Sequence, residues 1–352
     1  MKDIGEGTIR RIDWTELTPV VLLLRVFNVA LGLRVLALGF IGLWLTVMLN
    51  SFVGILFLDQ GWPKPANWDM PLLNVPLDIL YSALMTTLSM RQSPALLSLW
   101  LSGFILIWAF CGGMICRIVA LRLTVDESES TRNLFLFFRN RGIGFVSSLI
   151  ILSLGILCCF LPVKIAGWMM ALPVLNYVVA ILFPIPLLFA FFTVILALGL
   201  AIGWMLLFAA VSTDGSDGFD AISRMFSYIF QRPFHYVLYW ACCGILGWLG
   251  FLLVQFLVHV ALYICGSVVP EHGGCQSGLL ESFWSPLVLS LPIAYAFAWF
   301  WTSSVAIYLL LRRSVDATPF SEVYRVAPPK VRTLPVIKQD ERGAPEIIEP
   351  QS

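Results

Sequence analysis

The sequence predicts an all-α integral membrane protein with about six transmembrane helices, in-plane amphipathic helices and an internal repeat of helix-plus-hairpin units. Of its 352 residues, 59% are hydrophobic and 12% are charged, whereas an average soluble domain has roughly 25% charged residues. The mean hydropathy is +0.88, and several uncharged runs are long enough to cross a hydrocarbon layer of about 30 Å. The formal net charge of +1 gives no indication of a nucleic-acid partner.

Six spans are predicted in chain order. A mostly polar cytoplasmic segment (1–16) precedes the membrane domain (17–311), and a cytoplasmic tail (312–352) follows it. The tail is charged and rich in proline, a composition typical of flexible or extended chains. Charged residues or prolines bound most of the apolar runs, which places the spans near residues 35–58, 94–116, 143–163, 186–210, 236–264 and 286–311.

Residues 165–211 contain no charge, and this stretch has two interpretations. It crosses the membrane twice, with a break near Pro184 and Pro186, or a re-entrant or interfacial piece over 166–183 precedes one crossing. With six crossings, only Lys64, Arg91 and Lys164 of the 22 Lys and Arg residues lie on the outer side. The positive-inside rule therefore favours six spans, with both termini on the cytoplasmic side of a bacterial inner membrane.

An amphipathic helix is predicted between two long apolar runs. Asp214, Asp217 and Asp220 supply turn and N-cap chemistry, and Pro233 ends the helix. Apolar residues recur at helical spacing between them, which predicts a helix that lies on the membrane surface; they are Ile222, Met225, Phe226, Ile229 and Phe230. Two further in-plane elements are expected, and the three together would form a cytoplasmic collar: Leu17–Leu33, Arg132–Arg141 and Ala221–Gln231.

A weak internal repeat supports this organisation. An offset of 91 residues aligns acidic, aromatic, amide and basic positions in turn: Glu129 with Asp220, Phe135 with Phe226, Asn140 with Gln231, and Arg141 with Arg232. We expect three units, each an in-plane helix followed by a hairpin of two spans. The alternative is that every cytoplasmic linker requires an acidic cap and a basic stop, which produces the same pattern without a repeat.

Two short motifs carry a resemblance to known proteins. Asp220-Ala-Ile-Ser-Arg224, followed by an aromatic helix, Arg-Pro and a span, resembles a group of uncharacterised bacterial multi-pass proteins. It is more distantly similar to the membrane domain attached to some glycerophosphodiester phosphodiesterases. Cys111-Gly-Gly-Met-Ile-Cys-Arg-Ile-Val-Ala120 looks like the segment that closes an earlier span in the first group. The resemblance implies a membrane fold and no reaction, because the phosphodiesterase catalytic domain has no counterpart in this chain.

The predicted spans contain no Asp, Glu, Lys or Arg, which disfavours an ion-coupled transporter. Gln255 and His259 share one face of the fifth span, where they either contact a ligand or hydrogen-bond between helices. No catalytic constellation is evident. We also expect no metal or other cofactor, because the three histidines fall at different predicted depths.

Membrane lipids are the expected partners. Five arginines beside the in-plane elements are candidate contacts for anionic headgroups, the alternative being that they only set the topology: Arg132, Arg139, Arg141, Arg224 and Arg232. Cys265 and Cys275 are candidates for a disulfide if the outer side is oxidising. Glycine-rich helix faces offer surfaces for self-association or for a protein partner; they contain Gly199 and Gly203, and Gly244, Gly247 and Gly250.

The predicted function is that of a non-enzymatic integral membrane protein, a scaffold or accessory subunit of the cytoplasmic membrane. The alternative is a transporter or channel for a lipid or a weakly polar solute. The transport alternative is supported by the repeat and by the break near Pro184 and Pro186, because broken helices at repeat interfaces often line substrate sites.

Overall fold

The computed structural model describes residues 21–57, 94–268, 284–325, 336–339 and 345–348. Six helices in this part of the chain are long and apolar enough to cross a membrane, so the chain is an all-α multi-pass membrane protein. These helices satisfy their backbone hydrogen bonds internally, as the bilayer requires. They are α3 (Leu33–Phe57), α5 (Pro94–Thr124), α6 (Thr131–Met170), α8 (Pro184–Asp214), α10 (Pro233–Val268) and α13 (Leu291–Asp316).

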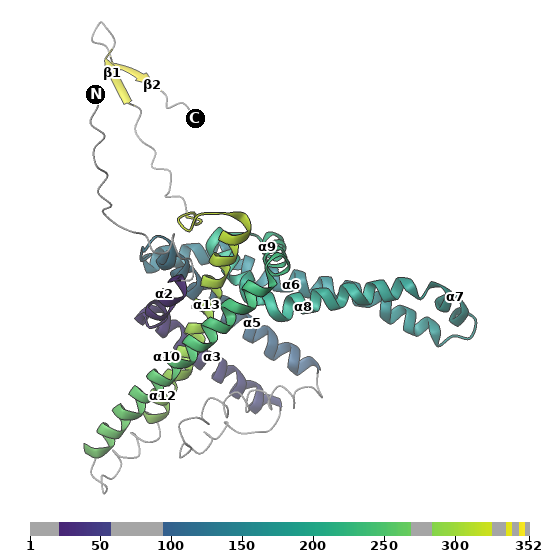
Figure 1. The fold of residues 1–352 in the computed structure, drawn as a ribbon, viewed down its shortest axis with the longest axis horizontal. Helices are drawn as coiled ribbons and strands as arrows, with labels where there is room; N and C mark the ends of the chain where they lie inside the picture. Colours follow the sequence, from purple (N-terminus) through teal and green to yellow (C-terminus); the bar gives the residue numbers. More distant parts are fainter. Residues whose placement is uncertain (1–20, 58–93, 269–283, 326–335, 340–344, 349–352) are drawn as a thin grey trace.

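Shorter elements connect or follow the long helices. They are α2 (Val21–Ala30), α7 (Leu175–Leu182), α9 (Gly218–Gln231), α12 (Ser285–Leu289), β1 (Val336–Gln339) and β2 (Pro345–Ile348). The two strands pair antiparallel, with Val336 opposite Ile348. In Figure 1 they lie well away from the helices.

The long helices form three hairpins that diverge from a common base (Figure 1). The most extensive helix–helix contacts are those of α6 with α8, α3 with α5, and α10 with α13. We define the base as the region where α2, α9, the start of α6, the ends of α5, α8 and α13, and residues 317–325 meet. The helix order contains the three hairpins of the predicted units, but only the first and third hairpins follow a separate short helix, α2 and α9.

The core of the protein is formed by α5 and α13. Within an apolar 18-residue stretch of each helix, 72% and 83% of the residues of α5 and α13 are buried, against 17% in α6 and 11% in α8. An aromatic cluster joins three hairpins around the indole of Trp301 in α13, whose ring centroid lies 6.0 Å from Trp108 of α5 and 4.8 Å from Phe208 of α8. Large rings at such distances supply most of the burial that holds helices of different hairpins together.

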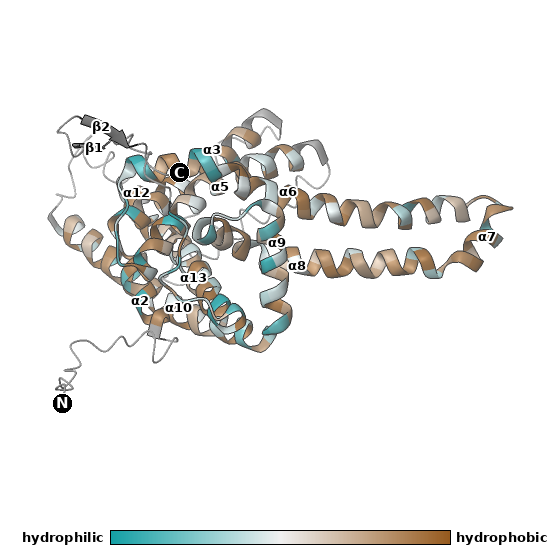
Figure 2. Cartoon of the chain, turned by 90° about the horizontal axis from the view of Figure 1, so that it is seen from above, coloured by the Kyte–Doolittle hydropathy of each residue, from teal (hydrophilic) through white to brown (hydrophobic). Residues whose placement is uncertain are grey.

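The α6–α8 hairpin projects furthest from the core, and we call it the arm. In the view from above it is almost entirely hydrophobic, with α7 at its tip (Figure 2). α6 alone is 40 residues long, which corresponds to about 60 Å at 1.5 Å per residue. Beyond the base, the arm packs mainly against itself.

Of the helices that begin in the uncharged stretch 165–211, only α8 is long and apolar enough to cross a membrane. α6 continues to Met170, the short α7 turns the chain, and α8 runs back from Pro184 to Asp214. This differs in detail from the expected interfacial piece over 166–183, because the first residues of that piece extend α6. Pro184 takes the first turn of α8, where a proline costs no hydrogen bond.

Two of the three expected in-plane elements are separate helices, α2 and α9. The third prediction is wrong: Arg132–Arg141 is the first part of the continuous helix α6. No glycine or proline interrupts the chain before Gly142, so the helix that starts after its N-cap Ser130 runs directly into the span. The collar therefore contains two short helices and the beginning of a long one.

The tail also differs from expectation. α13 extends to Asp316, and residues 317–325 pack on the base. The prediction of a flexible tail is therefore wrong for residues 312–325, which are part of α13 or pack on the base. The expected segment 1–16 lies outside the described residues, as does Cys275; Cys265 is exposed near the end of α10.

Candidate functional site

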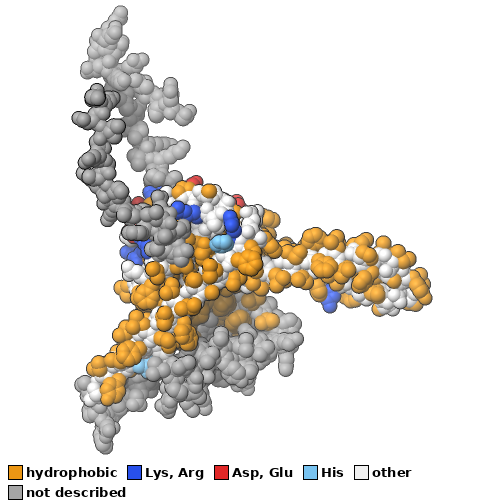
Figure 3. Space-filling view, viewed as in Figure 1, with side chains coloured by type: hydrophobic (Ala, Val, Ile, Leu, Met, Phe, Trp, Pro, Cys, Tyr) orange, Lys and Arg blue, Asp and Glu red, His pale blue; other side chains and the backbone are white. Residues whose placement is uncertain are grey.

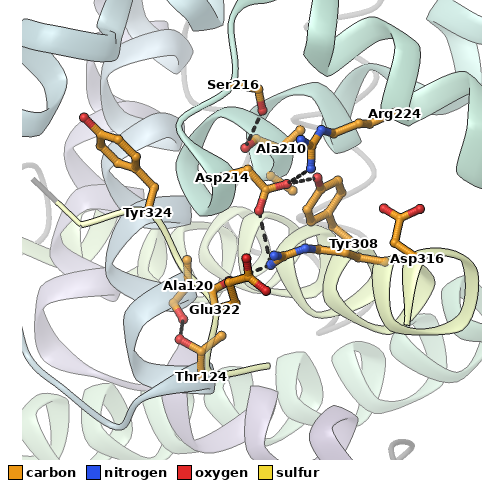
Figure 4. Close-up of polar contacts among 12 residues, drawn as sticks. Ala120, Thr124, Ala210, Asp214, Ser216, Arg224, Tyr308, Asp316, Glu322 and Tyr324 are labelled. Atoms are coloured by element: carbon orange, nitrogen blue, oxygen red, sulfur yellow. Dashed lines mark hydrogen bonds and ion pairs between the residues drawn. The ribbon is translucent and has the colours of Figure 1, made fainter. Parts of the chain in front are cut away.

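A cluster of charged side chains at the base centres on Asp214, the last residue of α8 (Figure 4). Its side chain is only 8% exposed. Oδ2 accepts hydrogen bonds from the hydroxyl of Tyr308 at 2.5 Å and from Nη1 of Arg224 at 2.6 Å. Oδ1 faces Nη1 of Arg312 at 3.1 Å without hydrogen-bond geometry, so that contact is an ion pair. We call these four residues the Asp214 cluster.

The Asp214 cluster joins three helices. α8 contributes the aspartate, α13 contributes Tyr308 and Arg312, and α9 contributes Arg224. Arg224 also binds Asp220 one turn earlier on α9. Partial burial lowers the pKa of Arg224, but hydrogen bonding to Asp220 and the nearby Asp214 charge outweigh it and raise the pKa above its usual range. Arg224 therefore stays charged at any physiological pH.

A second contact ties α9 to α13 beside this cluster. The hydroxyl of Tyr228 donates a hydrogen bond to a carboxylate oxygen of Asp316. Burial, together with this hydrogen bond, raises the pKa of Tyr228 above its ordinary value of 10.0. The phenol therefore remains a neutral donor at neutral pH.

Arg117 near the end of α5 forms the second charged group of the base. Its side chain is 1% exposed and lies 3.2 Å from a carboxylate oxygen of Glu129. Nη1 donates to two backbone carbonyl oxygens, those of Ser212 at 3.2 Å and Tyr324 at 2.8 Å. The guanidinium also sits 4.4 Å from the ring centroid of Phe137. A buried arginine thus links α5, α6, α8 and the chain beyond α13.

Residues 317–325 form a strap across the base. The N–H of Tyr324 donates to the carbonyl of Thr213 at 2.8 Å, and Arg312 donates to the carbonyl of Glu322 at 2.8 Å. The Tyr324 ring lies over Gly215, where a Cβ atom would come within 2.6 Å of it. Gly215 has a φ of +64°, a left-handed conformation that glycine adopts at little cost.

The charged groups of the base hold the helix ends together and have a structural role. The buried charges have opposite charges or backbone carbonyls as partners, which is the condition for retaining them inside a protein. The groups around Asp214 are occupied with one another, and none is paired as a nucleophile with a base. Among the described residues, no three His, Cys, Asp or Glu side chains gather to hold a metal ion.

The structure places the predicted intramembrane pair in the middle of α10. Gln255 is 2% exposed, and its backbone carbonyl lies 2.9 Å from Nδ1 of the half-buried His259. This contact is within one helix turn and satisfies the ring nitrogen locally. It resembles the hydrogen bonding that polar side chains make inside membrane helices and gives no indication of a ligand.

The five candidate lipid-binding arginines divide into two groups. Arg141 pairs with Asp217 at 3.1 Å, and Arg224 belongs to the Asp214 cluster. Arg132, Arg139 and Arg232 are exposed and form no ion pair with a described residue. The sequence could not separate them, because all five follow the same amphipathic pattern.

Most of the glycine faces pack inside the chain. A Cβ at Gly199 would meet Phe226 of α9, and one at Gly203 would meet Met225. On α10, Gly247 lies against Trp299 and Gly250 against Tyr295. Gly244 alone of these five faces open space. These glycines therefore bring helices of the same chain together, a role that small residues commonly have in membranes.

Sequence reasoning missed the residues that organise the base. The sequence predicts a turn at Asp214 and the end of a span at Arg117 but not the partners of either side chain, and no pattern distinguishes Tyr308 or Tyr324. A signal was present in Arg117 and Arg312, since each follows a long apolar run at the end of a span.

No family model, curated protein or solved structure matches this chain.

Proposed function

We propose that the protein is a non-enzymatic scaffold or accessory subunit of a membrane assembly, with the arm as its docking element. The observation that carries the proposal is the exposure of the arm beyond the base: only 17% of an apolar 18-residue stretch of α6 and 11% of such a stretch of α8 are buried. Hydrophobic side chains cover the visible face of the arm (Figure 3). Other described helices of the chain do not cover the distal parts of α6 and α8. These exposed apolar surfaces could therefore bind another protein within the membrane.

The base supports the same proposal. Its ion pairs and the strap fix the ends of α5, α8 and α13 relative to one another. A fixed base holds the arm at one angle, which a scaffold requires. A transporter instead requires elements that rearrange around a substrate.

The transport alternative has less support. The break at Pro184 lies at the start of α8, beside α7 at the tip of the arm. It is therefore distant from the packed core, whereas substrate sites of transporters lie at the interface between repeats. His259 bonds within its own helix, as described above.

We place the protein in the cytoplasmic membrane, with the base and both termini on the cytoplasmic side. On the face shown in Figure 3, charged side chains gather at the base. Among the Lys and Arg residues of the described helices, Lys164 is the one far from the base, near the distal end of α6. This asymmetry is the one expected from the positive-inside rule.

Photo-crosslinking in native membranes tests the docking role of the arm. A photoreactive phenylalanine replaces Leu157 of α6 or Phe191 of α8, which are 58% and 61% exposed. Phe256 of α10, 60% exposed, is the matched control. Both arm positions should yield the same protein adduct, identified by mass spectrometry, and the control should not.

The partner must also co-purify with this chain in a fixed ratio when the partner itself carries the affinity tag. Adducts with lipid alone at both arm positions would refute the docking role. Solute uptake by liposomes containing the purified protein would instead favour the transport alternative.

A further inference from the structure

The arginines that the base does not use lie beside exposed aromatic rings. On α6, Arg132 and Arg139 stand seven residues apart and so share a helix face with the residues midway between them. Phe135 and Leu136 occupy that position and are 57% and 36% exposed. We call Arg132, Phe135, Leu136 and Arg139 the α6 patch.

A second patch occupies the junction of α9 and α10. Arg232 is the C-cap of α9, and its backbone N–H donates to the carbonyl of Tyr228. Phe230 and Phe234 flank it and are 63% and 86% exposed. We call Phe230, Arg232 and Phe234 the junction patch. Phe230 belongs to the predicted apolar face of α9, of which the structure buries Met225 and Ile229 and leaves Phe230 exposed.

Both patches lie where a membrane span begins. The uncharged part of α6 starts at Gly142, one turn after Arg139, and α10 starts at Pro233, directly after Arg232. This position corresponds to the headgroup layer, where interfacial helices combine Lys or Arg with Trp, Phe or Leu. Phenyl rings at such exposure are unfavourable in water but contact acyl chains and glycerol in that layer.

We propose that the α6 patch and the junction patch bind the headgroups of anionic phospholipids on the face of the membrane that carries the base. The guanidinium groups of Arg132, Arg139 and Arg232 have no carboxylate partner among the described residues, so they are available to lipid phosphates. Guanidinium pairs with phosphate through charge-assisted hydrogen bonds. The flanking phenyl rings hold the acyl ends of the same lipids. The proposal does not depend on a docking role for the arm.

Lipid binding to the purified full-length protein tests this assignment. The affinity for a fluorescent phosphatidylglycerol is measured in a phosphatidylcholine background, for the wild type and for a variant carrying Arg132→Gln, Arg139→Gln and Arg232→Gln. Each arginine near an anionic surface should contribute about a fivefold effect. The triple variant should therefore bind roughly a hundredfold more weakly, and the remaining affinity should depend less on salt.

The matched control is the variant Arg141→Gln with Arg224→Gln, which removes the two arginines engaged in ion pairs. It should unfold at a lower temperature and still bind phosphatidylglycerol like the wild type. If the triple variant does not fold, Arg232→Gln alone carries the test, with an expected loss of about fivefold.

Equal loss of affinity in the control variant, with its fold intact, would overturn the assignment. So would wild-type affinity in the triple variant. Competition by soluble glycerol phosphate at concentrations near the lipid affinity would also overturn it, because that result indicates a site for a free phosphate rather than for a lipid surface.

Discussion

Replacing Asp214 by asparagine should strongly destabilise the protein. Asparagine has nearly the same shape and keeps an oxygen for the hydroxyl of Tyr308, but it removes the negative charge. Arg312, whose side chain is 7% exposed, then lacks the ion-pair partner that offsets its burial. Breaking a buried pair by removing one partner costs about 3–5 kcal/mol.

The matched control is Asp217→Asn. Asp217 pairs with Arg141 at 3.1 Å, but its side chain is 84% exposed, and an exposed pair contributes about 0–1 kcal/mol. Asparagine also remains a good N-cap residue for α9. Thermal unfolding in detergent should therefore show a melting temperature lower by roughly 10 °C for Asp214→Asn and nearly unchanged for Asp217→Asn.

A double variant separates the lost charge from other effects. Adding Arg312→Met to Asp214→Asn removes the charge that was left without its ion-pair partner, so part of the lost stability should return. Equal melting temperatures for Asp214→Asn and Asp217→Asn would refute the reasoning, because they would show that water reaches the Asp214 cluster and screens it.

Three further changes test the packing of the base and of α10. Gly215→Ala should lower the free energy of unfolding by about 1–2 kcal/mol and should release the strap, seen as faster proteolysis near Tyr324; unchanged proteolysis would contradict this. Gly247→Ala places a Cβ 2.2 Å from an indole nitrogen of α13 and should cost about 1–3 kcal/mol by overpacking, whereas Gly244→Ala should be neutral; equal effects of the two would count against the packing of α10 on α13. Tyr228 has a raised pKa in the folded state, so its contribution to stability is complete below pH 10 and is lost as the pH rises from there through the folded pKa. Tyr228→Phe should weaken the alkaline dependence in a pH series of melting temperatures, and an unaltered series would show that Tyr228 makes no contribution to it.

Composition and charge spacing were sufficient to predict the membrane class and the six spans. The reason is physical: uncharged runs near 20 residues have few alternatives to a membrane-spanning helix. The prediction of a single crossing over 165–211 came from the distribution of Lys and Arg between the two sides of the membrane. The local sequence of that stretch did not decide it. The in-plane assignment of Arg132–Arg141 failed because amphipathic spacing gives the helix period but not the point where one helix ends.

The base could not be predicted from the sequence. Asp214 and Arg312 are nearly 100 residues apart, and their pairing depends on the way in which α8 and α13 converge. The five arginines followed one pattern, and only the positions of Asp217, Asp214 and Asp220 separate the paired ones from the exposed ones. Such long-range contacts require knowledge of which helices are neighbours.

The continuity of α6 gives the protein a mechanical property. Because one helix runs from the charged base to the distal tip, any change of angle at the base is multiplied along the length of the arm. From Gly142 to Met170 the helix is about 42 Å long at 1.5 Å per residue. A tilt of about 10° at the base would therefore carry the tip sideways by about 7 Å. The ion pairs that hold α8, α9 and α13 together at the base therefore also set where the tip of the arm lies.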